Sequence, residues 1–122
     1  MAKGDRVVVG NGYSWKEDGS SVMTYMLKLD HQNQMILNPD GSVVVAPAGG
    51  VKVGSLGIIE GPVINVHRSY LHNANDYAPS YGGKDFVQMV PVMLERYQRV
   101  GYFPVDNIRF FGSYTHWTYL TL

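Results

Sequence analysis

Glycine and proline interrupt this chain so often that long helices have little room to form. Fourteen glycines and six prolines are spread over 122 residues, and the segments between them are short and rich in valine, isoleucine and tyrosine. Such segments favour β-strands, whereas glycine and proline favour the turns that join them. The sequence therefore predicts an all-β, or nearly all-β, fold in a single domain over residues 1–122.

The positions of the strands follow from these apolar runs. We expect strands over residues 6–9, 22–29, 56–60 and 63–67, a long loop over 11–21, and a C-terminal strand extension over 113–122. Residues 35–45 predict a β-hairpin, because Asn38, Pro39, Asp40 and Gly41 are turn formers between two apolar runs. Residues 46–50 are small and predict a connector, and no internal repeat is apparent. Residues 91–99 fit either a strand, which we favour, or a short helix opened by Pro91.

One stretch of the chain resembles a known small domain. Residues 92–111 are similar to the end of an SH3 domain, where Gly101-Tyr102-Phe103-Pro104 would lead through a single 3₁₀ turn into a last strand starting at Ile108. Residues 3–9 and 53–60 resemble the opening strands of KOW-type and related SH3-like barrels. The resemblance implies an SH3-like small β-barrel with long loop and hairpin insertions. It does not imply polyproline binding, because the ligand-binding tyrosine of signalling SH3 domains falls at Asn107.

The charge balance and the absence of cysteine limit the partners. Ten basic and ten acidic residues cancel, and the basic ones are scattered, so nucleic acid is an unlikely main partner. A net charge near zero suits a chain that packs against copies of itself. Without cysteine, disulfides and thiolate metal sites are excluded. No membrane-length apolar segment and no signal-peptide core are found, so we expect no membrane association and a location in the cytoplasm or a virion.

The residues that could carry catalysis are few and poorly arranged. His67, His72 and Asp76 form the best candidate metal site, but their spacing does not place them on one face of a strand or helix. No serine nucleophile elbow and no phosphate-binding glycine loop are present. We therefore expect no cofactor and no enzymatic activity, with a metal-dependent enzyme using these three residues as a second alternative.

Exposed aromatic residues are the candidate partner-binding groups. Tyrosine and tryptophan give a large contact area at low entropic cost and are enriched at protein interfaces. They concentrate in the polar loop after residue 67 and in the C-terminal run. The predicted partner-binding residues are Tyr70, Tyr77, Tyr81, Tyr114, Trp117 and Tyr119.

These features predict a non-enzymatic structural or assembly protein. It would dock on copies of itself or on a larger complex through exposed strands and tyrosine-rich loops. In its overall sequence pattern the chain resembles a small virion protein of a tailed phage, such as a head–tail joining, tail or capsid-cement subunit. The first alternative is an SH3/KOW-type module that binds peptide or RNA through Tyr102, Phe103 and Arg109, together with the loop tyrosines Tyr70, Tyr77 and Tyr81.

Overall fold

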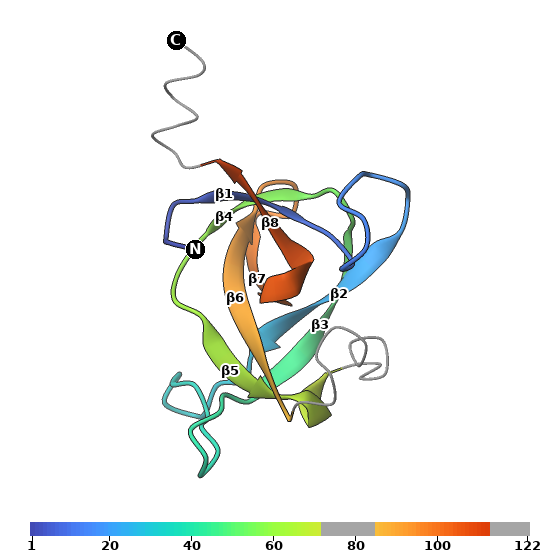
Figure 1. Cartoon of the computed structure of the whole chain (residues 1–122). Coiled ribbons are helices and arrows are strands. Elements are labelled where there is room, and N and C mark those ends of the chain that lie inside the picture. The colour runs from blue at the N-terminus through green and yellow to red at the C-terminus, as the bar shows by residue number, and fades with distance from the viewer. Residues whose placement is uncertain (72–84, 113–122) are drawn as a thin grey trace.

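The computed structural model describes residues 1–71 and 85–112, and it confirms the all-β expectation (Figure 1). The only helical pieces among these residues are two single 3₁₀ turns, η1 (Arg68–Tyr70) and η2 (Val105–Asn107). No helix in this part of the chain is long and apolar enough to cross a membrane. The strands are β1 (Arg6–Val9), β2 (Ser21–Leu27), β3 (Val45–Lys52), β4 (Leu56–Ile59), β5 (Ile64–His67), β6 (Phe86–Leu94), β7 (Arg99–Pro104) and β8 (Ile108–Gly112).

All eight strands belong to one antiparallel sheet, whose order is β3-β2-β7-β6-β4-β1-β8, with β5 also paired to β6. The sheet curls strongly (Figure 1), and β7 pairs with β2 on one side and with β6 on the other. It remains open, and β3 and β8 stand at the two ends of the strand order. The small barrel expected from the sequence is therefore a curled, open sheet.

The central strand β6 pairs with two different strands along one edge. Its first half pairs with β5, from Phe86 to Met89, and its second half pairs with β4, from Val92 to Leu94. Pro91 lies at the changeover between the two partners. A proline has no N–H to give to a ladder, so a break in the pairing is the place where a central strand tolerates one.

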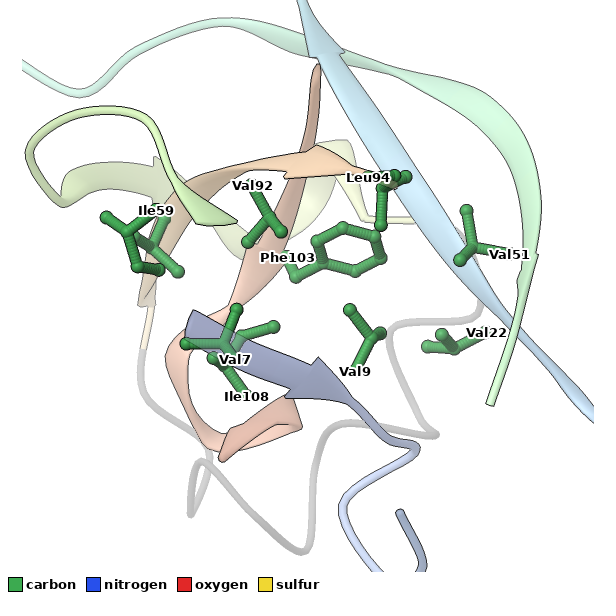
Figure 2. Close-up of a cluster of buried hydrophobic side chains, with 10 residues drawn as sticks. Val7, Val9, Val22, Val51, Ile59, Val92, Leu94, Phe103 and Ile108 are labelled. Atoms are coloured by element: carbon green, nitrogen blue, oxygen red, sulfur yellow. The ribbon is translucent and has the colours of Figure 1, made fainter. Parts of the chain in front are cut away.

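A first cluster of buried side chains fills the space beneath β1, β4, β7 and the second half of β6 (Figure 2). Phe103 lies in the middle of it and is completely buried. Nine aliphatic side chains complete the cluster: Val7, Val9, Val22, Val51, Ile59, Val90, Val92, Leu94 and Ile108. Burying a side chain of this kind stabilises a fold by roughly 1.5–3 kcal/mol, so this cluster is a main source of stability.

A second cluster lies among β2, β3, β5 and the first half of β6. It contains Tyr25, Val43, Val45, Val66, Leu71, Val87 and Met89. β6 serves both clusters because its neighbours Met89 and Val90 are both fully buried. On β2 the change of face comes at an irregularity in the pairing with β3, where Met23 pairs with Gly50 and Tyr25 with Pro47. Between these two pairs, β3 has one residue more than β2. One of the β3 residues there is Gly49, whose φ of +97° is the conformation that a glycine bulge needs.

The sequence predictions for the turns and strands have mixed outcomes. The predicted 3₁₀ turn and the last strand from Ile108 are confirmed as η2 and β8. The helix alternative for residues 91–99 is wrong, because this stretch completes β6 and then turns at 95–98. The connector expected at 46–50 is also wrong: it is part of β3, held there by pairing with β2.

The predicted hairpin at 35–45 is confirmed and has a twin eight residues earlier. In the first turn Asp30 N–H donates to the Gln34 carbonyl, and Asn33 N–H donates to the Asp30 carbonyl. In the second, the same two bonds recur from Asn38 to Ser42 and from Gly41 to Asn38. Asn33 and Gly41 both have positive φ, 59° and 86°. The structure therefore contains a local repeat that the sequence prediction missed.

Candidate protein-interaction surface

An apolar row crosses the outside of the sheet over five strands. Its members, hereafter the outer face, are Val8, Leu56, Ile58, Met93, Val100 and Phe111. The members on β1, β4, β6 and β7 point outward because they alternate along their strands with buried residues such as Val7, Ile59 and Val92. Phe111 lies at an irregularity in the pairing of β8 with β1 and lines the same cleft as Leu56, Ile58 and Met93.

The strand register makes the outer face continuous. Val8 is directly opposite Leu56, and Ile58 is directly opposite Met93. Met93 is in turn opposite Val100 on β7. Directly opposed side chains on one face of a sheet touch or nearly touch. The exposed fractions of Leu56, Val100 and Phe111 are 38%, 39% and 45%, so the row presents a sizeable apolar surface to the solvent.

Phe111 lines a small cleft in the outer face, hereafter the Phe111 cleft. The cleft has a volume of about 250 Å³, and its wall includes Leu56, Ile58, Met93 and Phe111, with Arg6, Glu95 and Gln98 supplying polar groups. It is smaller than the ~300–1,000 Å³ usual for small-molecule sites. A cleft of this size suits a single large side chain from another polypeptide.

A second, wider cleft adjoins the first. It has a volume of about 450 Å³ and shares Leu56 and Glu95 with the Phe111 cleft. Its far wall is the loop before β2, where Glu17 accepts an ion-pair contact from Arg96 at 3.4 Å. Both charged side chains are more than half exposed, so this pair contributes at most about 1 kcal/mol. The two clefts are therefore neighbours that share part of their walls at Leu56 and Glu95.

The two end strands of the sheet differ in how well they are protected. β3 pairs only with β2, but its ladder contains Pro47 and the glycine bulge, which hinder the addition of another strand. β8 pairs only with β1 among the described strands. Its pairing with β1 also contains an irregularity, near Arg6, but it has neither a proline nor a lysine, and Phe110 is 61% exposed. Of these two end strands, β8 is therefore the more open to pairing with another chain.

The loop between β1 and β2 is fixed to β8 by its tryptophan. The guanidinium of Arg109 lies 3.7 Å from the centroid of the Trp15 ring, and the indole N–H donates to the Asn107 carbonyl at 3.0 Å. A side chain at Gly10 would overlap the Trp15 ring, with only 2.6 Å from its Cβ to the indole N. The tryptophan is thus held by a cation–π contact and a hydrogen bond, and it links the loop before β2 to η2 and β8.

These contacts bear on the predicted peptide- or RNA-binding residues. Phe103 is completely buried in the first cluster, so its assignment to a stacking surface is wrong. Arg109 is already stacked on Trp15. Asn107 is only 4% exposed, and burial raises the pKa of Tyr102. The sequence resemblance predicted the local structure here, but the aromatic shelf that stacking needs is not formed by these residues.

Of the six predicted partner-binding residues, only Tyr70 lies in the described part of the chain. Its hydroxyl donates to Asn38 Oδ1 at 3.2 Å, and its half-buried ring packs against the second cluster. These contacts tie η1 to the second of the twin turns. The other five, Tyr77, Tyr81, Tyr114, Trp117 and Tyr119, lie outside the described residues, and their role stays a prediction.

The candidate metal site is described only at His67. Its Nδ1 lies 2.7 Å from Ser69 Oγ and accepts the Ser69 N–H, and its ring packs edge-on against Phe86. His72 and Asp76 lie outside the described residues. Within residues 1–71 and 85–112 no cluster of three metal-binding side chains is found. The contacts of His67 are those of a side chain that caps the turn η1.

Two exposed carboxyls have their pKa lowered by turn hydrogen bonds. Ser42 lowers the pKa of Asp40, first through its hydroxyl and then through its N–H, which donates to Asp40 Oδ1 at 2.8 Å. Ser20 lowers the pKa of Asp18 in the same way. Each carboxylate stabilises its own turn and faces no cleft described above.

The outer face was not among the sequence predictions, although the sequence contains a signal for it. Val7-Val8-Val9, Ile58-Ile59 and Val92-Met93-Leu94 are apolar on both faces of their strands. Such runs are typical of strands covered on both sides. One side is covered by the core, and the other is open in the single chain.

Comparisons with protein-family models, with curated proteins and with solved structures found no match to this chain.

Proposed function

We propose that this chain is a non-enzymatic assembly protein that docks on copies of itself. The outer face carries the proposal: an apolar row over five strands, with a cleft beside β4 and an open edge at β8. Apolar patches of this kind on a folded domain mark contact sites with other proteins. A net charge of zero removes the long-range repulsion between copies.

The chain beyond Gly112 supports the same conclusion. Residues 113–122 contain no lysine, arginine, aspartate or glutamate and alternate strand-forming residues, including Trp117 and Tyr119. Strand addition between chains needs an open edge on one and a β-forming segment on the other. This chain has both, and they are adjacent in sequence. A role as a virion subunit would be one setting for such assembly and stays a prediction.

Deletion of residues 113–122 tests the proposal. Light scattering coupled to gel filtration should give a multiple of 13.6 kDa for the full chain and a monomer for the shortened one. Near-ultraviolet circular dichroism reports whether the shortened chain keeps its packed core, since both clusters lie before residue 113. An unchanged assembly after deletion would show that the C-terminal segment is not required.

A further inference from the structure

The Phe111 cleft offers a place for one anchoring side chain, and its position indicates where that side chain comes from. The described chain ends at Gly112, the residue after Phe111. The ten residues that follow, fully extended, would span about 33 Å. A segment of that length on a neighbouring copy could lie along the whole outer face from β8 to β7.

The charges around the cleft favour an uncharged occupant. The positively charged Arg6 and the negatively charged Glu95 both line it. A strongly charged segment would therefore meet a like charge on one side. Residues 113–122 carry no such charge. Their hydroxyl groups can donate to the Glu95 carboxylate.

Aromatic side chains in central pockets are the strongest anchors of protein interfaces, with tryptophan the most enriched. Trp117 is the only tryptophan in the segment and lies at its middle. Leu56, Ile58 and Met93 supply apolar lining to the cleft. Contact between an indole ring and these aliphatic and thioether groups is favourable.

We propose that residues 113–122 of a second copy cover the outer face, with Trp117 seated in the Phe111 cleft. This inference rests on the proposed self-assembly and adds the site and the occupant. The interface it describes is reciprocal in a dimer, or head-to-tail in a larger ring, because each copy supplies one face and one segment.

Charged substitutions in the outer face of the full-length chain test the site. Leu56→Arg and Phe111→Arg should each weaken self-association at least about tenfold. Both side chains are partly exposed, and an arginine stem can lie along the sheet, so the fold should survive. Leu37→Arg is the matched control, because Leu37 is 57% exposed in the second twin turn, away from the outer face. Thermal melts report the fold of each variant.

A mixing experiment tests the occupant. Trp117→Ala should be a monomer by light scattering, as should Leu56→Arg. Mixed in equal amounts at high micromolar concentration, the two should form a heterodimer, because the intact segment of one meets the intact face of the other. With one of the two reciprocal contacts, this heterodimer should be weaker than the wild-type dimer.

The outcomes separate the two proposals. Wild-type chain that stays monomeric would overturn the assembly function itself. Assembly that persists in Leu56→Arg and Phe111→Arg would overturn only the site on the outer face. Two monomeric variants that do not associate when mixed would overturn the second copy as the occupant and indicate that the segment covers its own chain.

Discussion

Phe103 and Phe110 allow the same substitution to be compared in the core and on the surface. Phe103 is 0% exposed and lies among nine aliphatic side chains in the first cluster, whereas Phe110 is 61% exposed on β8. Replacing Phe103 with alanine removes a buried ring and leaves a cavity that the short, branched neighbours cannot easily fill. We predict a loss of about 3–5 kcal/mol in the free energy of unfolding.

That loss is a large part of the ~5–15 kcal/mol that stabilises a typical domain. It should lower Tm by about 10–25 °C for a chain of this size. The measurement is chemical and thermal unfolding followed by circular dichroism at low protein concentration, where any self-association contributes least. Phe110→Ala, measured in parallel, should change the free energy of unfolding by no more than about 0.5 kcal/mol.

An equal or smaller loss for Phe103→Ala than for Phe110→Ala would refute the placement of Phe103 at the centre of the core. The curling of the sheet around the Phe103 ring would then be wrong as well. If the loss of unfolding free energy in Phe110→Ala grows with protein concentration, the result would instead agree with an interface at β8.

Three further predictions concern close packing, the loop anchor and pH. Gly101→Ala should cost about 1–3 kcal/mol, because the new methyl would overlap Thr24 Oγ1, whereas Gly61→Ala, with ordinary 3.6 Å contact, should be nearly neutral in denaturant unfolding. Trp15→Phe keeps a ring near Arg109 but loses the bond to the Asn107 carbonyl, and should cost about 0.5–1.5 kcal/mol; no loss would show that this bond is unimportant. In the folded state the pKa of Asp40 is lowered from its ordinary 3.8. The charged carboxylate therefore stabilises the fold above pH 3.8, and this stabilisation is lost as the pH falls through the lower pKa of the folded state. The Tm advantage of wild type over Asp40→Asn should therefore be present at neutral pH and vanish in acid, and an advantage independent of pH would contradict the assignment.

Much of the fold could be predicted from local patterns. The apolar runs at Arg6–Val9 and Ile64–His67 form β1 and β5, and the Gly-aromatic-aromatic-Pro element leads through η2 into β8. These elements are specified by nearby residues, so sequence patterns find them. Residues 46–50 are an opposite case. Ala46-Pro47-Ala48-Gly49-Gly50 has the composition of a loop, and only pairing with β2 makes it a strand.

The candidate interaction surface was harder to predict because it depends on which strands are neighbours. Leu56, Met93 and Val100 belong to three strands and come together only through the sheet register. Local patterns also could not separate the roles of Phe103 and Phe110, one central to the core and one on an open edge. Long-range pairing decides both questions.

Self-association through the outer face is the central claim, and the native mass tests it most directly. Light scattering of the full-length chain over a range of micromolar concentrations should give an integral multiple of 13.6 kDa, falling toward the monomer for Leu56→Arg but not for Leu37→Arg. A mass of 13.6 kDa for the wild-type chain at every concentration would contradict the claim.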